Sequence, residues 1–424
     1  MNWKFSRRVW LFLTASFSFG LGQAFMHLFL NFFLRSLGLE GSMQGIINAM
    51  PAIISAAMSI PAIWVTRKFS EVTTLKIGSI LSVAGLALLA GSSGAALALA
   101  GAFIQGLGSA LIMVSASPFM AGETSEANRV PLFSLQMALS TGAGFLGNIL
   151  GGQIPGVYAR LTGMPADSVE ALRAALILAV VLQLIGTIPI FFIQAYKDQK
   201  DEADLQPAGF SVENKRLMAK LIIPNFAVGL GAGATIPYLN LFIEAKFNID
   251  YATMGSLFGW TSLATATTVL IQPWIVRKLG QIRAILAVQL ASLPFLVILG
   301  FAPWFSLVVL AMFTRGALMN AASPVYSAYA MNLLSVRDRP VYSALNMMSW
   351  NSGWAIMATV SGSFRGFMGP ERILTSFNWL FAWTILMYAL SLALIYFWLY
   401  PKKEAAASRA DQVDIMDVSI REEP

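Results

Sequence analysis

A short sequence motif near the start of the chain, called the phrase below, recurs about halfway along the chain. Gly20-Leu21-Gly22 and Asn31-Phe32-Phe33 are matched by Gly229-Leu230-Gly231 and Asn240-Leu241-Phe242, and all these matches are 209 positions apart. Ordered matches at one offset are the mark of an internal repeat. Others follow at nearly the same offset: Trp64–Phe69 with Trp274–Leu279, Gln105-Gly106 with Arg315-Gly316, Ser115–Pro118 with Ala321–Pro324, and Pro131–Ser134 with Pro340–Ser343. The chain is therefore predicted to contain one structural unit twice.

Its apolar character indicates where this unit folds. Hydrophobic residues make up 57% of the chain and charged residues 12%, which is outside the range of soluble domains. Apolar runs of about 20 residues, enough to cross a bilayer as a helix, recur along its length. The predicted spans are 9–34, 43–66, 74–93, 95–119, 132–158, 171–194, 218–243, 252–275, 283–301, 304–331, 341–363 and 373–399.

The internal repeat and the predicted membrane spans together divide the chain into four parts. We expect an N-terminal six-helix bundle over 1–194 and a C-terminal six-helix bundle over 218–400. The polar stretch 195–217 between them is predicted to be a cytoplasmic linker. The charged tail 401–424 has no apolar face and is predicted to be a disordered cytoplasmic segment. The predicted fold class is an all-α integral membrane protein with two pseudo-symmetric bundles.

Basic residues predict the orientation. If both termini lie on one side of the membrane, that side holds 21 of the 28 Lys and Arg residues and the opposite side holds 6. The positive-inside rule then places both termini and the linker in the cytoplasm. The first apolar run is too long for a cleaved signal peptide, so we expect it to be retained. The net charge of +7 belongs to this membrane face and does not indicate nucleic-acid binding.

Several kinds of chemistry are disfavoured. The chain has no cysteine and one histidine, which argues against zinc and haem sites, and no cofactor is expected. No Walker sequence and no nucleophile–base–acid set is recognisable, so neither ATP-driven pumping nor enzymatic activity is expected. The partners expected are a small-molecule solute and the bilayer, with protons as an option for coupling, and the protein is expected to be a monomer.

With twelve spans in two halves, a central cytoplasmic linker and a basic loop between spans two and three, the chain resembles the major facilitator superfamily. The family's loop signature is Gly-x-Leu-x-Asp-Arg-x-Gly-Arg-Arg, and the corresponding stretch here is 63–72. Arg67 takes the place of the acid, while Lys68 keeps the base; in the second half Arg277 again replaces the acid. The resemblance implies a cytoplasmic gate, whose predicted residues are Arg67, Lys68, Glu71, Glu123, Arg129, Arg277 and Lys278, with Glu71, Glu123 or Glu126 as acidic partners.

Two further family signatures bear on function. Gly147–Gly152 resembles the glycine signature of the antiporter branch, with Asn148 in place of proline; close helix packing is the favoured interpretation of these glycines. Efflux pumps of the family often carry an arginine three residues before Gln105, where this chain has Ala102. The resemblance also implies alternating access around a cavity lined by spans 1, 4, 5, 7, 8, 10 and 11.

Few ionisable residues fall inside the predicted spans, where a charge is costly. His27 is one of them, and it shares a helix face with Gln23 and Asn31 because the three are four residues apart. We interpret this stripe as facing a water-filled cavity, with hydrogen bonding inside a packed bundle as the alternative. His27 is also the only side chain placed to exchange protons near neutral pH.

Arg315 is the other deep ionisable residue. It occupies the position that Gln105 has in the first half, so the two are predicted to face each other across the pseudo-two-fold axis, where transporters of this kind bind solutes. Arg315 is predicted to hold a carboxylate or phosphate. The alternative is a structural arginine whose guanidinium is bonded to backbone carbonyls or to Asn320.

Span eleven carries Asn346, Trp350 and Trp354 at a helical spacing. Residues in such a stripe usually pack inside the protein, but Trp side chains beside an Asn can also form a binding wall on which a flat or apolar solute stacks. The predicted solute-binding set is completed by Asn240, the repeat partner of Asn31, and by Asn320 and Tyr326 in span ten.

The sequence thus predicts a secondary transporter in the cytoplasmic membrane that moves a small amphiphilic solute, with an anion as one option and export as the favoured direction. Uptake or facilitated diffusion of a polar metabolite such as a sugar is one alternative. A lipid or lysolipid flippase, in which Arg315 would hold the headgroup, is another.

Overall fold

The computed structural model describes residues 5–58, 61–194, 212–335 and 338–400, and these residues form helices with no strand. Most of the predicted linker and all of the tail lie outside the described residues. The helices of the first half are α1 (Arg7–Ser36), α2 (Ser42–Met58), α3 (Pro61–Phe69), α4 (Glu71–Ala90), α5 (Ala95–Gly122), α6 (Glu126–Thr162) and α7 (Val169–Phe191). Those of the second half are α8 (Lys215–Thr235), η2 (Ile236–Tyr238), α9 (Leu239–Phe247), α10 (Tyr251–Leu279), α11 (Gln281–Phe301), α12 (Phe305–Leu333), α13 (Asp338–Met368), η3 (Pro370–Arg372) and α14 (Ile373–Leu399).

These elements follow the predicted spans closely. Eight helical stretches among the described residues are long and apolar enough to cross a membrane: α1, α4, α5, α7, Lys215–Phe247, α11, α12 and Pro370–Leu399. The number twelve remains a prediction, because the stretches corresponding to spans two, five, eight and eleven do not meet this measure. The protein is nevertheless a helical chain with several membrane-spanning stretches.

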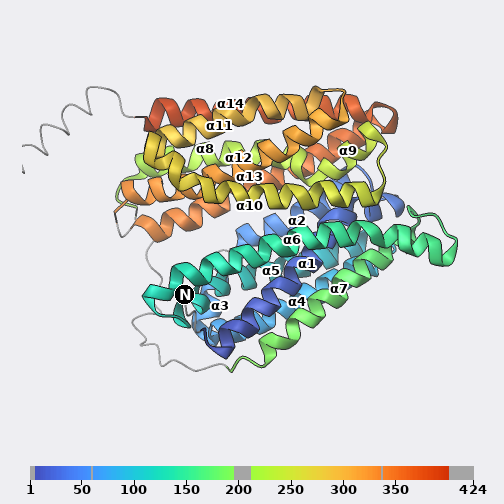
Figure 1. Ribbon diagram of the computed structural model, residues 1–424, viewed down its shortest axis with the longest axis horizontal. Helices are drawn as coiled ribbons and strands as arrows, with labels where there is room; N and C mark the ends of the chain where they lie inside the picture. The colour runs from blue at the N-terminus through green and yellow to red at the C-terminus, as the bar shows by residue number, and fades with distance from the viewer. Residues whose placement is uncertain (1–4, 59–60, 195–211, 336–337, 401–424) are drawn as a thin grey trace, which may run out of the picture.

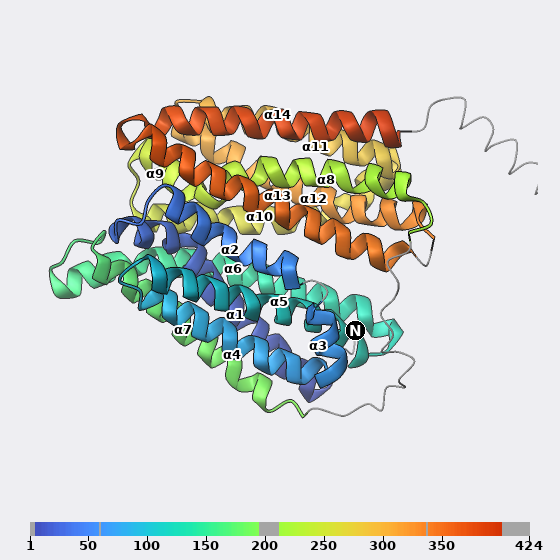
Figure 2. The same cartoon turned by 180° about the vertical axis from the view of Figure 1, so that it is seen from behind.

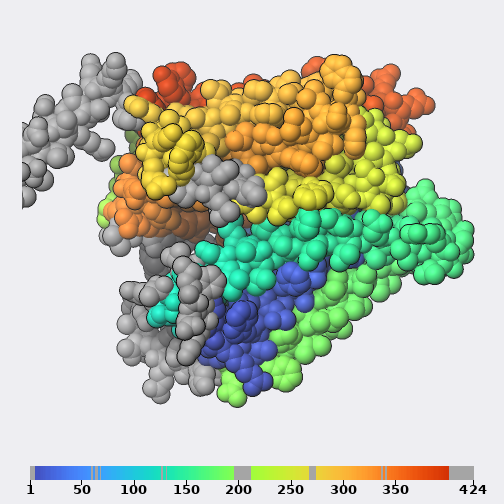
Figure 3. All heavy atoms as spheres, viewed as in Figure 1, coloured from blue at the N-terminus to red at the C-terminus, as the bar shows by residue number. Residues whose placement is uncertain are grey.

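The two halves lie side by side as separate bundles (Figures 1 and 2). Figure 1 shows the bundles meeting at one end and diverging toward the end where the N-terminus lies. We call the latter the terminal end and the opposite one the far end. The halves make their largest contacts between α2 and α13 and between α6 and α10, and α1 also meets α9. In Figure 3 α6 runs along α10 on the visible face.

Glycines allow these close contacts. An ideal Cβ on Gly362 of α13 would lie 2.5 Å from the Gly41 carbonyl oxygen, and one on Gly255 of α10 would lie 2.3 Å from the Asn148 carbonyl oxygen. Gly152 meets α10 in the same way, 2.6 Å from the Tyr251 carbonyl oxygen. Small residues of this kind let membrane helices pack backbone to backbone. The glycines of span five therefore have a packing role in this structure.

The repeated Gly-x-Gly phrase has an equivalent packing role in each half. Gly22 lies against Gln183 of α7, where a Cβ would be 2.7 Å from that side chain. Its repeat partner Gly231 lies against Tyr388 of α14, with a corresponding distance of 2.8 Å. On the same helix, Gly229 and Gly233 let α13 approach so closely that their Cβ atoms would meet the backbone oxygens of Trp350 and Trp354. The second copy of the phrase, together with Gly233, thus lets three aromatic residues pack against α8.

Candidate functional site

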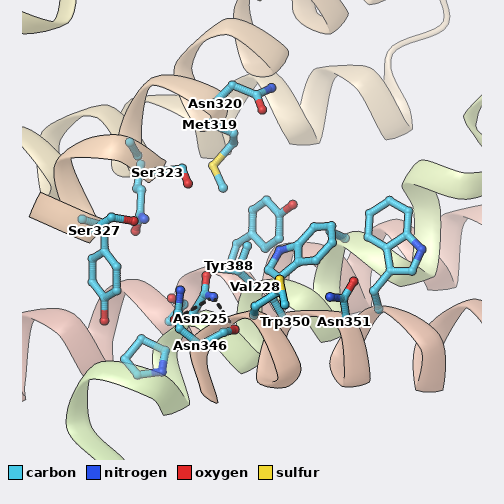
Figure 4. A pocket seen from close by; sticks show the side chains of 18 of the residues that line it. Asn225, Val228, Met319, Asn320, Ser323, Ser327, Asn346, Trp350, Asn351 and Tyr388 are labelled. Atoms are coloured by element: carbon cyan, nitrogen blue, oxygen red, sulfur yellow. Dashed lines mark hydrogen bonds between the residues drawn. The ribbon is translucent and has the colours of Figure 1, made fainter. Parts of the chain in front are cut away.

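A cavity of about 670 Å³ lies toward the terminal end of the bundle, and we call it the central cavity. Its described lining comes almost entirely from the second half, and only Ser55 and Met113 belong to the first half. In Figure 4 Met319, Asn320 and Ser323 of α12 lie on one wall, facing Asn225 of α8 and Asn346 and Trp350 of α13 on the other.

This lining corrects the expected set of spans. Spans 4, 7, 10 and 11 contribute as predicted, whereas no described side chain of spans 1, 5 and 8 lines this cavity. Helices α1, α6 and α10, which correspond to these three spans, pack against one another instead. Residues from α2, α11 and α14 take their places.

Arg315 lines the central cavity and is 8% exposed. Its Nη2 donates to the Tyr388 hydroxyl oxygen at 2.7 Å, and its Nε has no hydrogen-bond partner. No carboxylate of the described residues lies within ion-pair distance of it. Asn320 does not bond to Arg315, since its amide donates to the Gly316 carbonyl. Arg315 is therefore a buried cation that shares a cavity wall with neutral polar groups.

Aromatic rings and amides form the rest of the wall. The rings of Trp350 and Trp354 stack with centroids 5.0 Å apart and an interplanar angle of 29°. The Asn225 amide donates to Asn346 Oδ1 at 3.0 Å, as the dashed lines in Figure 4 show. Tyr326 also lines the cavity, but its hydroxyl donates to the Leu221 carbonyl oxygen at 2.7 Å. The wall thus offers a flat apolar surface beside a cation.

Asn31 and Asn240 do not line the central cavity; they bond to each other between the two halves. Asn31 Nδ2 donates to Asn240 Oδ1 at 2.9 Å and to the Pro237 carbonyl, and Asn240 Nδ2 donates to the Leu28 carbonyl at 3.0 Å. Pro237 and Leu28 are themselves repeat partners at the same offset. The short 3₁₀ turn η2, which Pro237 helps to form, interrupts the helix and leaves this carbonyl accessible to Asn31.

One turn further toward the far end, Arg35 and Glu244 form a two-pronged ion pair, with Nη1 2.7 Å from Oε2. These residues are also 209 positions apart. Two pairs of repeat partners therefore touch across the interface, which places the pseudo-two-fold axis between them. We call Asn31, Asn240, Arg35 and Glu244 the axial cluster. It closes the space between the halves at the far end.

His27 is exposed although residues 24–26 and 28–34 are all buried. Its Nε2 lies 3.4 Å from Nε2 of Gln23, and Gln183 donates to Gln23 Oε1 at 3.3 Å. Gln105 does not mirror Arg315: it is 1% exposed in the first half, and its Oε1 has no hydrogen-bond partner. The predicted residues thus fall into separate places, with Arg315, Asn320, Tyr326, Asn346, Trp350 and Trp354 on the cavity wall and Gln23, His27, Asn31, Gln105 and Asn240 away from it.

The predicted gate residues lie at the terminal end. Glu123 forms its ion pair with Arg8, at 2.6 Å, and so its described partner is none of the bases that were expected. Lys68 lies over the Phe69 ring and Lys278 over the Trp274 ring. Arg277 is in the last turn of α10, Glu71 in the first turn of α4 and Arg129 in the first turns of α6. The side chains of Arg67 and Glu126 lie outside the described residues.

Sequence reasoning missed several cavity residues. Tyr388, the partner of Arg315, is 73 positions away from it, and no periodicity links the two. Asn225, Gln289 and Asn351 also line the cavity. A signal did exist for Asn225, because a polar amide beside Pro224 stands out in an apolar span.

The chain is similar to proteins of one known superfamily. Residues 221–417 match the sequence model of the Major Facilitator Superfamily. The second half of the chain therefore carries the sequence signature of this superfamily. Solved structures of this fold extend the likeness to the whole described chain, and the predicted fold class is confirmed.

Two of these structures have a TM-score of 0.72. The nucleoside transporter NupG is 14% identical, and the match covers 93% of this chain and 99% of that one. An inward-facing, unoccupied bacterial homolog of the human lysosomal transporter Spinster is 13% identical, with 92% and 97% covered. The E. coli fucose:proton symporter FucP is 16% identical, with a TM-score of 0.59 and 92% and 98% covered. No curated protein matches the chain. The superfamily assignment makes this chain a multi-pass membrane transporter.

Proposed function

We propose that the chain is a secondary transporter that exports a small organic anion with a flat apolar part by alternating access. The observation that carries this proposal is Arg315, a buried cation on the wall of the central cavity that has no carboxylate partner among the described residues. A desolvated guanidinium is stabilised by an anionic ligand that can bond to it. The stacked Trp350 and Trp354 rings supply a surface for the apolar part of the same solute.

The proposed direction of transport and the proposed orientation of the protein in the membrane rest on further features. The excess of Lys and Arg at the terminal end favours a cytoplasmic location for it, and the proposed membrane is the cytoplasmic one. The central cavity lies toward this end while the axial cluster closes the far end, and this arrangement supports the proposal that the solute enters from the cytoplasm. The six-helix domains 1–194 and 218–400 would then rock about the axial cluster.

The test uses thermal stabilisation of the detergent-purified protein, because a ligand that binds only the folded state raises the melting temperature. The panel holds drugs, sugars, organic anions and lysolipids. We expect stabilisation by aromatic carboxylates, and Arg315→Gln should weaken it by roughly 10- to 150-fold, the loss of one charged hydrogen bond of about 1.5–3 kcal/mol. Arg160→Gln removes one exposed arginine at the far end and serves as the matched control.

Other results would identify the alternatives. Stabilisation by sugars that is unchanged in Arg315→Gln would overturn the anion proposal and favour uptake of a polar metabolite, for which the Asn225–Asn346 amide pair is suited. Stabilisation by lysolipids, together with movement of a lipid reporter, would favour a flippase.

Coupling to protons is proposed to use His27, the exposed residue in an otherwise buried stretch of α1. His27→Gln keeps a polar side chain but cannot titrate. We expect this variant to lose the dependence of transport on pH between about 5.5 and 8 while still binding solute. An unchanged pH profile in proteoliposomes would rule out His27 as the proton carrier.

A further inference from the structure

A second cavity lies at the far end, beyond the axial cluster as seen from the central cavity. It has a volume of about 990 Å³, and both halves contribute to its walls. The first half supplies the end of α1 and the start of α2, and the second half supplies α9 and the end of α13. Arg35 and Glu244 lie on its wall and neutralise each other. We call it the far-end cavity.

Arg365 is the other cation of this cavity. It is 6% exposed, and no carboxylate of the described residues is within ion-pair distance of it. One Nη donates to Gln44 Oε1 at 3.1 Å, and the guanidinium carbon lies 3.8 Å from the centre of the Tyr238 ring. Its Nε is buried and has no hydrogen-bond partner. The groups that bond to or stack on this guanidinium are neutral, and the Glu40 carboxylate lies near it but beyond ion-pair distance. A buried guanidinium without a directly bonded carboxylate favours an anion beside it.

The surroundings of Arg365 repeat those of Arg315. Each arginine has one nitrogen bonded to a neutral side chain, lies over a tyrosine ring and has an Nε without a partner. Each also lines a cavity large enough for a small organic molecule. Both are in the second half, and Asn31 and Asn240 lie between the two cavities. The two arginines therefore offer similar anion sites on opposite sides of one closure.

We propose that the far-end cavity is a second binding site for the transported organic anion, with Arg365 binding its carboxylate. This rests on the proposed function, because it assigns the same solute to both sites. An exported anion would leave Arg315 when the axial cluster opens and bind Arg365 before release. Glu40 lies on the wall of the far-end cavity and opposes the anion, which limits the affinity and helps release.

The experiment is isothermal titration of the full-length protein with 1-naphthoate, a flat aromatic carboxylate. The wild type should bind two molecules, and Arg365→Gln and Arg315→Gln should each bind one. Arg372→Gln removes an exposed arginine at the same end and should still bind two. Glu40→Gln should raise the affinity of the second site, the one lost in Arg365→Gln, by about three- to tenfold, because the variant lacks a nearby negative charge.

Two outcomes separate this inference from the proposed function. A single wild-type site that is lost in Arg315→Gln, or two sites retained in Arg365→Gln, overturns the far-end site and leaves the proposed function intact. Absence of binding to the wild type contradicts both. If Arg365→Gln does not fold, Arg365→Lys is used instead, because it keeps the charge. The test is then the affinity of the second site in Glu40→Gln, and an affinity equal to that of the wild type overturns the inference.

Discussion

At the far end of the interface Asn31 bonds to its own repeat partner Asn240, whereas Gln105 and Arg315, also repeat partners, lie in unlike surroundings. The first pair shows that the duplicated halves still meet about a two-fold axis. The second shows a buried cation on the cavity wall in the second half, where the first half has a buried glutamine away from the cavity. A contact on the axis has to suit both copies at once, so symmetry is useful there. An asymmetric solute needs different groups on its two sides, so a binding site between two unlike halves can fit it better than one between identical halves.

The largest effect is expected at the contact between α2 and α13 at the far end. Gly362→Leu would force α13 away from Gly41, because even a Cβ would lie 2.5 Å from that carbonyl oxygen. We expect the halves to separate at the far end and transport to fall at least about 100-fold, since the closed state would be destabilised by several kcal/mol.

The measurement uses the absence of native cysteines. Ala49→Cys introduces a thiol at a position of α2 that is buried against α13. A membrane-impermeant maleimide should label it slowly in the parent protein and at least about tenfold faster with Gly362→Leu. Gly156→Leu is the control, because no atom lies within 4 Å of its Cβ position. Equal labelling rates in all three proteins would show that the α2–α13 contact does not close the far end.

Exchanging the charges of the Arg35–Glu244 ion pair tests the position of the two-fold axis. Arg35→Glu places a second acid beside Glu244, and we expect far-end labelling of Ala49→Cys to rise about fivefold, since a partly exposed pair contributes roughly 1 kcal/mol. The double variant Arg35→Glu, Glu244→Arg should return to the parent rate, because two-fold related positions can exchange charges with little change in geometry. A double variant that labels as fast as the single one would place the axis elsewhere.

The smallest effect is expected at Gln105. Gln105→Leu removes a buried acceptor that has no partner, so the melting temperature should stay equal or rise, and transport should remain within about twofold of wild type. Transport assays in proteoliposomes with Arg315→Gln in parallel would check this. A loss in Gln105→Leu as large as that in Arg315→Gln would show that both halves bind the solute.

The sequence by itself was enough to predict the duplication, the helical spans and the family, because each is encoded locally in apolar run length and in short phrases that recur at one offset. It also pointed to Arg315, Trp350 and Trp354, since a deep charge and aromatic residues at helical spacing are visible without a partner. The roles of the repeated glycines were less visible, because a glycine shows that something packs closely and not what that partner is.

The contacts between side chains of different helices became visible in the folded structure. Asn31 and Gln23 share a helix face with His27, yet Asn31 bonds across the axis and Gln23 bonds to α7 within its own half. Tyr388 reaches Arg315 because Gly231 lets α14 approach α8. These outcomes depend on the crossing and register of helices far apart in the chain, which helical periodicity does not contain. The asymmetry of the cavity has the same origin: equivalent positions become different sites once their neighbours differ.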